Sequence, residues 1–325
     1  SSDVCSSDLR ENLMNTGIFN FVNLTYVNDP LQGLTIVVDV TERWYVFPVP
    51  LFEMVDRNFN EWIRSGDPGR INYGLDLDWS NFRGLNDHLK MQFKWGYTHR
   101  IGVAYQIPFN NWKAEEKLSF SAGFTSSRET GYGVDESTLL LFKGDGNPVR
   151  KEYYFGLNYS KRSGYFNSFS PAMEYRNNRV RDTIVAMNPA FLGNGKNNQE
   201  LITFSWGFRR DMRDYKFYPL RGFLFDLDVV KNGMGVLVNE PDLLFFSSQF
   251  KYFRPLSEKF GLAGSVKGKW SGKSDAPYFN QRALGYNNDF IRGYEYYVIP
   301  GQNYALLKLN FKYTLIDRKS TRLNS

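Results

Sequence analysis

The sequence contains little cysteine, little histidine and no long apolar run. Its one cysteine, Cys5, lies in the first nine residues, and there are two histidines among 325 residues. Disulfide and thiol chemistry are therefore not expected, and His88 and His99 fit surface positions better than a catalytic triad or a metal site. No stretch approaches the ~18 apolar residues of a membrane-spanning helix. We expect no catalytic residue, no bound metal and no cofactor.

The charge balance and the hydropathy are compatible with a membrane protein that crosses the bilayer with strands instead of helices. The formal net charge is +6, and the Lys and Arg residues are scattered rather than clustered, so no nucleic-acid partner is indicated. The mean hydropathy of −0.46 is that of a soluble protein, yet 17% of the residues are aromatic. A transmembrane β-barrel combines these properties, because only every second residue of a strand meets lipid.

The two ends differ in character from the rest. Residues 1–9 (SSDVCSSDL) and 318–325 (RKSTRLNS) resemble translated sequencing-adapter DNA. Such segments are excluded from fold reasoning, as processing or cloning remnants are. We expect the remaining chain to be a fragment that is open at both ends.

Strict alternation of apolar and polar residues dominates the sequence from Trp44 onward. In Ile71–Ser80, for example, Ile, Tyr, Leu, Leu and Trp alternate with Asn, Gly, Asp, Asp and Ser. About twelve such segments of ~9–12 residues follow one another, each long enough to cross a bilayer as a tilted strand. The fold class is therefore predicted as all-β, a transmembrane antiparallel β-barrel. The alternative is a soluble sandwich, which shows the same alternation with its apolar faces turned inward.

The connections between these segments favour the barrel. Counted from Trp44–Met54, the connections alternate between short turns, such as residues 83–86 and 161–164, and long loops, such as residues 128–149 and 271–303, with one short exception at His99. Outer-membrane barrels have short periplasmic turns and long external loops, whereas a sandwich has no reason to sort its loops. Aromatic residues also stand near the segment ends, where an interfacial girdle would lie.

Two segments carry recognisable motifs. The loop 271–303 contains a hydrophobic–Arg–Gly–aromatic sequence, Ile291, Arg292, Gly293 and Tyr294. A turn further upstream contains two Arg–Asp pairs followed by proline and glycine: Arg210, Asp211, Arg213, Asp214, Pro219 and Gly222. Proline fixes such a turn and glycine lets the next strand begin close by, so a well-built turn is the simpler explanation of these side chains. Together the two motifs resemble those of the Omp85 superfamily, also called the bacterial surface antigen D15 family.

This resemblance implies a role for Arg292. In the family the loop folds back into the barrel, and its arginine pairs with an acid on the inner wall. The family's acid would lie on a strand beyond Ile316, so Asp226 and Asp228 are the best remaining acids. An unpaired, partly buried guanidinium is costly, and its planar fork suits a carboxylate better than lysine does. We expect Arg292 to brace the loop and the barrel.

The resemblance also implies a domain order. Residues 10–43 are expected to form the C-terminal part of a POTRA-like α+β domain: a helix ending near Gly17, then two strands around the turn Asn28-Asp29-Pro30. Residues 44–317 are expected to form an incomplete Omp85-type barrel, about twelve of roughly sixteen strands. This places the protein in the bacterial outer membrane, with its N-terminal part in the periplasm.

The function implied by the family is non-enzymatic insertion and folding of outer-membrane proteins. Client strands would add at a weak seam by β-augmentation. The candidate seam strand is Trp44–Met54, including Trp44, Val46, Pro48 and Pro50, because prolines suit an edge strand. The prolines can equally mark a linker. The expected partners are unfolded outer-membrane clients, outer-membrane lipid, and accessory lipoproteins or periplasmic factors. The alternatives are a two-partner-secretion translocator of the same superfamily and a passive porin-like barrel.

Overall fold

The structure is a computed structural model. It describes Leu13 and residues 18–29, 33–55, 59–67, 69–109, 115–238, 240–257, 259–272, 276–286, 291, 293–294 and 297–314. The two N-terminal strands, β1 (Phe19–Asp29) and β2 (Gly33–Glu42), pair only with each other, as an antiparallel hairpin. These are the two strands predicted before the barrel. The helix predicted from residue 10 to Gly17 lies, apart from Leu13, outside the described residues.

One antiparallel sheet makes up most of the protein. It contains 12 strands in the order β18-β15-β14-β13-β12-β11-β10-β7-β6-β5-β4-β3, so strands adjacent in the sheet follow each other along the chain. The strands are β3 (Val46–Met54), β4 (Ile71–Ser80), β5 (His88–Gly96), β6 (Thr98–Pro108), β7 (Glu116–Ser127), β10 (Arg150–Ser163), β11 (Asn167–Val180), β12 (Asn198–Asp211), β13 (Gly222–Asn232), β14 (Leu243–Pro255), β15 (Phe260–Ser271) and β18 (Tyr304–Tyr313). Each alternating segment of the sequence is a strand of this sheet.

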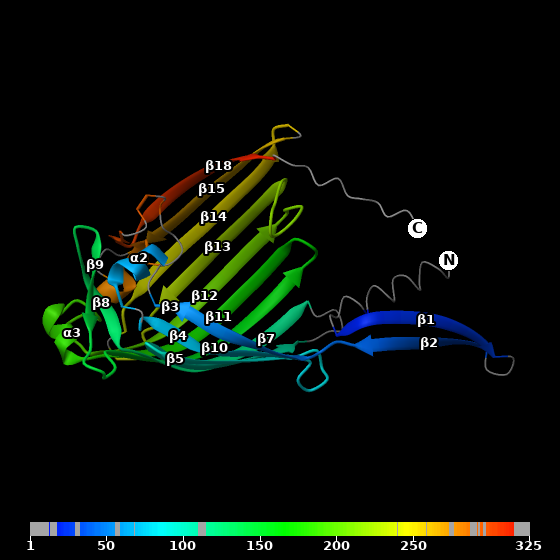
Figure 1. Cartoon of the computed structure of the whole chain (residues 1–325), viewed down its shortest axis with the longest axis horizontal. Coiled ribbons are helices and arrows are strands. Elements are labelled where there is room, and N and C mark those ends of the chain that lie inside the picture. Colours follow the sequence, from blue (N-terminus) through cyan, green and yellow to red (C-terminus); the bar gives the residue numbers. More distant parts are fainter. Residues whose placement is uncertain are drawn as a thin grey trace.

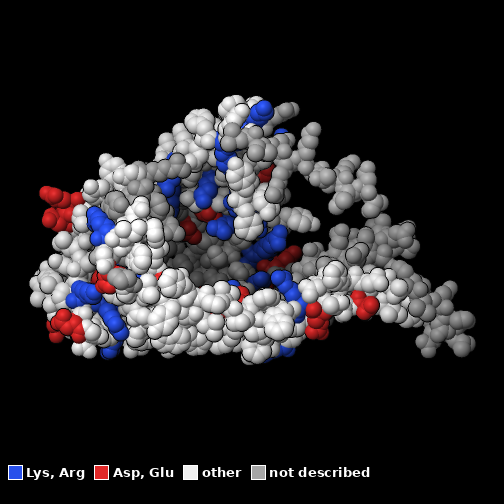
Figure 2. Space-filling model, viewed as in Figure 1, with Lys and Arg blue, Asp and Glu red and all other residues white. Residues whose placement is uncertain are grey.

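The sheet curves around a hollow, and its two faces differ in chemistry (Figures 1 and 2). Large apolar side chains on the convex face are exposed, among them Phe155 (58%), Met173 (54%) and Leu307 (65%). Burying one such side chain stabilises a fold by roughly 1.5–3 kcal/mol, so a water-soluble protein would not leave a whole face uncovered. This arrangement excludes the sandwich, in which these residues would pack against a second sheet.

The two ends of the sheet are unequal. One end carries the long connections, with α2 (Phe59–Ser65), α3 (Asp182–Met187) and the hairpin of β8 (Glu129–Asp135) and β9 (Thr138–Lys143) (Figure 1). The connection between β15 and β18 contains η1 (Tyr278–Asn280) and a small pair, β16 (Arg282–Leu284) and β17 (Ile299–Pro300). Short turns occupy the other end, where the β1–β2 hairpin also lies. The short helices were not predicted.

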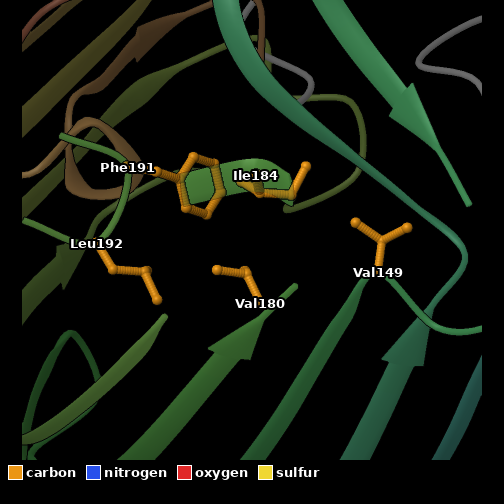
Figure 3. Packing of buried hydrophobic residues seen from close by; sticks show 5 residues of the cluster. All are labelled: Val149, Val180, Ile184, Phe191 and Leu192. Carbon is orange, nitrogen blue, oxygen red and sulfur yellow. The ribbon is translucent and has the colours of Figure 1, made fainter. Parts of the chain in front are cut away.

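Among the described residues, the largest buried apolar cluster lies under the long connections. Val149, Val180, Ile184, Phe191 and Leu192 are buried together where α3 and its flanking segments cover the strand ends (Figure 3). Tyr278 and Phe279 of η1 pack against this cluster. Because the strands turn their polar residues inward, apolar burial is concentrated at this end. The cluster therefore anchors the loop that carries η1.

Three details complete the fold. The barrel is not closed: in the described part of the chain β3 and β18 are the two edges of the sheet and do not pair with each other. Trp44 precedes β3 rather than belonging to it, and its side chain is 72% exposed. No described helix is long and apolar enough to cross a lipid bilayer.

Candidate functional site

The concave face is a polar wall that carries cross-strand ion pairs. Lys94 on β5 contacts Glu53 on β3 at 2.5 Å, and Lys90 contacts Asp78 at 3.2 Å. Residues paired across antiparallel strands share a face, so these contacts identify the inner side of β3, β4 and β5. This quarter of the wall carries both signs of charge.

The other side of the hollow is basic. Strands β14, β15 and β18 contain no acidic residue, and Lys251, Lys267, Lys269, Lys308 and Lys312 all belong to them. Lys251, Lys267 and Lys308 line one recess of the concave face. Figure 2 shows Lys and Arg side chains inside the hollow. A wall that carries only positive charge attracts anionic groups and repels cations.

Asp226 and Asp228 both face the hollow from β13. Asp226 accepts a hydrogen bond from Arg209 Nε of β12 at 2.5 Å. Asp228 lies in register with Gly207 and Ser247, and it lines a recess with Lys267. Asp226 therefore has a direct cationic partner, whereas Asp228 shares its recess with Asp226, Arg209 and Lys267 and forms no ion pair within the described part of the chain.

The connection with the Arg–Gly motif reaches the inner wall through a part that was not predicted. Backbone N–H groups of Tyr278 and Phe279 donate to Ala190 and Phe191 carbonyls, both at 2.9 Å. This contact seats η1 beside α3, and Arg282 follows it with its guanidinium 4.8 Å above the Phe279 ring. The connection also docks on the β8–β9 turn, where Val298, fully buried, donates its N–H to the Ser137 carbonyl at 2.7 Å.

Arg292 itself lies outside the described residues. Its described neighbours form a turn: Tyr294 N–H donates to the Ile291 carbonyl at 2.9 Å, and Gly293 has a φ of +83°. The Tyr294 ring is 59% exposed and lies 5.7 Å from the Tyr297 ring. The bracing role of Arg292 stays a prediction.

The Arg–Asp turn is built as a compact unit between β12 and β13. Asp211 accepts two hydrogen bonds from the Arg213 guanidinium, at 2.8 and 2.7 Å. Asp214 Oδ1 accepts from the N–H groups of Tyr215 at 2.9 Å and Leu220 at 3.0 Å. Arg210 remains on β12, in register with Phe225. These contacts describe a rigid connection at the short-turn end.

Pro219 and Gly222 have separate tasks in the same turn. The Pro219 carbonyl accepts a hydrogen bond from Lys312 Nζ of β18 at 2.9 Å, which links the turn to the far edge of the sheet. Gly222 has a φ of +97°, and a Cβ at this position would lie 2.0 Å from the Met212 carbonyl oxygen. Only glycine fits here, because the left-handed backbone and the close approach both exclude a side chain.

Strand β3 presents an unusual free edge. Ser80 N–H donates to the Tyr45 carbonyl at 2.8 Å, and Val55 N–H donates to the Arg70 carbonyl at 3.0 Å. Both pairs continue the β3–β4 register, so odd-numbered residues of β3 exchange hydrogen bonds with β4. The even positions, which include Pro48 and Pro50, face the free edge. Because proline carries no N–H, the middle of this edge offers acceptors but no donors.

One buried ion pair at the long-connection end was not predicted from the sequence. Arg70, just before β4, makes two hydrogen bonds to the Glu129 carboxylate of β8, at 2.6 and 2.9 Å. Tyr97 Oη donates to the same carboxylate at 2.7 Å, and Arg70 is only 7% exposed. Partial burial and the Glu129 carboxylate raise the pKa of Tyr97, so the phenol stays protonated. No local sequence pattern could connect these two residues, which are 59 positions apart in the chain.

The two described histidines do not form a common site. His88 begins β5 and His99 is the second residue of β6. Within the described ranges no group of three His, Cys, Asp or Glu side chains is placed to hold a metal ion.

Comparison with solved structures places the fold among outer-membrane proteins. BamA from Haemophilus ducreyi lacking POTRA domains 1–3 has a TM-score of 0.59 at 13% identity, covering 86% of this chain and 52% of that one. CdiB from Escherichia coli has a TM-score of 0.57 at 13% identity, covering 95% and 55%, and CdiB from Acinetobacter baumannii 0.55 at 14%, covering 93% and 53%. The chain thus spans about half the length of these proteins.

A family model agrees with this likeness. No curated protein matches the sequence significantly. The model of the Omp85 superfamily domain matches residues 81–310, which is well over half of the chain and includes both motifs. The all-β architecture and the BamA and CdiB likeness point the same way. The chain belongs to the Omp85 superfamily.

Proposed function

We propose that this chain is the barrel part of an outer-membrane assembly factor, which inserts and folds client barrel proteins at the edge of β3. Superfamily members are non-enzymatic transporters or assembly factors, and they handle outer-membrane client proteins. The proposed partners are unfolded clients, outer-membrane lipid, and accessory lipoproteins or periplasmic factors. The proposed location is the bacterial outer membrane, with the N-terminal part in the periplasm.

The proposal assigns the domains as the sequence predicts them. Residues 10–43 are the C-terminal part of a POTRA-like domain, and the β1–β2 hairpin beside the short turns supports this placement. Residues 44–317 are part of a barrel, about twelve of roughly sixteen strands. Residues 1–9 and 318–325 are adapter-like and belong to neither.

The observation that carries the proposal is the position of Pro48 and Pro50 on the free edge of β3. A closing strand would find no donor at these two positions, so it would lose about 0.5–1.5 kcal/mol for each missing hydrogen bond. A seam weakened in this way opens readily, while the backbone carbonyls still accept hydrogen bonds from an incoming strand. Client strands can therefore exchange with the closing strand by β-augmentation.

Site-specific crosslinking tests this proposal. In a Cys5→Ser background, single cysteines replace Val46, Val49 or Phe52 of β3, and a control cysteine replaces Phe204 on the outer face of β12. Nascent client added to proteoliposomes should form disulfides with the three β3 positions and not with residue 204. Crosslinks confined to residue 204 would reject the seam.

A second candidate is a translocator of the two-partner-secretion type. The TM-scores to CdiB, 0.57 and 0.55, are close to that for BamA. The basic wall of β14, β15 and β18 gives this candidate a specific basis, since it suits the passage of an acidic polypeptide through the lumen. A cysteine at Gln249, on the inner face, would then trap the cargo, and the β3 positions would not.

A further inference from the structure

A cavity of about 350 Å³ lies between the inner wall and the connection that carries η1. Strands β11, β13, β14 and β15 form its outer side, and Phe279, Asn280 and Arg282 form its inner side. Three cations, Arg176, Lys269 and Arg282, line the cavity, and none of the described residues lining it is acidic. Nothing in the proposed seam mechanism uses this cavity.

The positive charge of the cavity is balanced only in part, by Glu174 and Glu152, which contact Arg176; Glu152 also lies within electrostatic reach of Arg282. Arg176 is engaged, because its guanidinium contacts Glu174 at 2.5 Å and Glu152 at 3.8 Å. In contrast, neither Lys269 nor Arg282 forms an ion pair with an acid of the described chain. Lys269 Nζ lies 4.4 Å from the centre of the Phe245 ring and 3.5 Å from the Arg282 carbonyl oxygen. Two cations without a direct acidic partner therefore face one cavity that opens to the hollow.

The neutral side chains of the cavity also present donors. Asn232 Oδ1 accepts a hydrogen bond from Thr203 at 2.9 Å, and Asn280 Oδ1 accepts one from Gln199 at 3.3 Å. With their oxygens engaged, both amides keep an NH₂ group as donor. The Ser247 hydroxyl also lines the cavity, but it is engaged with the Asp228 carboxylate and adds no free donor. The polar lining thus consists of donors and cations, the complement of an oxyanion.

From this geometry we infer that the cavity binds an oxyanion, a phosphate or a carboxylate group, between Lys269 and Arg282. Partly burying two cations without an ion-pair partner is costly, and an oxyanion lowers that cost through charge-assisted hydrogen bonds. Arg282 stays accessible to solvent inside the hollow, so a ligand can reach it. The Phe245 and Phe279 rings hold the two cations in place by cation–π contacts.

Calorimetric titration of the folded chain in detergent micelles with inorganic phosphate tests the inference. The expected result is saturable binding at one site, with Kd raised at least about fivefold in Lys269→Gln and in Arg282→Gln. Lys251→Gln is the matched control, because it removes the same charge from the inner face of β14 outside this cavity. It should change Kd less than about twofold, as a distant screened charge does.

Each other outcome has a defined meaning. Heat-modifiable migration on electrophoresis gels verifies that every variant is folded before titration. Absence of saturable binding, or an equal loss in Lys251→Gln and Lys269→Gln, would overturn the site and leave only general attraction by a basic wall. A parallel titration with acetate identifies the preferred group: tighter phosphate binding assigns a tetrahedral dianion, and tighter acetate binding assigns a carboxylate.

Discussion

Arg70 and Glu129 are joined by two parallel hydrogen bonds, although 59 residues separate them in sequence. Their side chains are 9% and 10% exposed, so the pair is buried. It fastens the segment before β4 to the β8–β9 hairpin at the long-connection end. We expect Arg70→Ala to lower the free energy of unfolding by about 3–5 kcal/mol, because an unpaired carboxylate would remain buried.

Urea unfolding followed by tryptophan fluorescence in micelles measures this loss. Lys143→Ala is the control, since its pair with Asp67 in the same region is 57% and 38% exposed. An exposed pair contributes under about 1 kcal/mol. Equal effects of the two variants would contradict the prediction.

Restoring donors to the edge of β3 should strengthen the seam. Pro48→Val together with Pro50→Val adds two N–H groups at positions that face the free edge, worth roughly 1–3 kcal/mol in a closed seam. We expect client insertion into proteoliposomes to slow severalfold. Phe52→Val, the next edge position, already carries an N–H and should insert client at the original rate. Unchanged insertion in the double variant would show that edge donors do not limit the reaction.

The glycine at the start of β13 should tolerate no side chain. Gly222→Ala places a Cβ against the Met212 carbonyl in a left-handed backbone, so we expect a loss of more than about 3 kcal/mol in unfolding free energy. Gly164, in the turn after β10, also has a positive φ (+65°) but open space around it. Gly164→Ala should cost only about 1 kcal/mol. A similar cost at both sites would mean that the Met212 contact relaxes easily.

Glu240 makes stability depend on pH. Partial burial alone would raise the pKa of Glu240, but backbone N–H donors of Ile202, Leu237, Val236 and Met234 outweigh it and hold the pKa below its ordinary value of 4.5. A depressed pKa stabilises the fold above the unfolded-state value, and the contribution is lost as pH falls through the folded-state value. Unfolding free energy should therefore decline below about pH 4.5, and less steeply in Glu240→Gln. If the unfolding free energies of the wild type and of Glu240→Gln decline equally as the pH falls, the prediction is wrong.

Arg292 is the arginine of the loop motif, and its bracing role is a prediction. If it braces the loop inside the lumen, Arg292→Ala should lower both the unfolding temperature and the client insertion rate. Arg209→Ala provides a comparison, because it frees Asp226, the acid considered for Arg292. If Arg292→Ala keeps both the unfolding temperature and the client insertion rate of the wild type, the prediction that Arg292 braces the loop is wrong.

The strands were predictable because lipid and water impose opposite demands on alternate residues. Residues such as Phe155 and Glu152 therefore reveal their faces by spacing alone. The helices α2 and α3 carry no such signal: with 7 and 6 residues they depend on packing, as Ile184 does on Phe191.

The contacts of the candidate site were less predictable. Asp226 was considered an acid for Arg292, yet the register of β12 and β13 brings Arg209 to it. Arg282 was not singled out at all, because its importance arises from Lys269 lying across the cavity. Pair relationships of this kind require the fold, since residues distant in sequence meet only through strand register.

The donor-poor edge of β3 also affects how two copies of this chain can meet. The uncovered edge of β3 could pair with the edge of another copy and cause aggregation before the protein reaches its membrane. When two such edges approach each other, each meets carbonyl oxygens opposite its prolines, and the ladder fails at its centre. Pro48 and Pro50 would thus keep unassembled copies apart while leaving the same edge open to a strand that brings its own N–H groups.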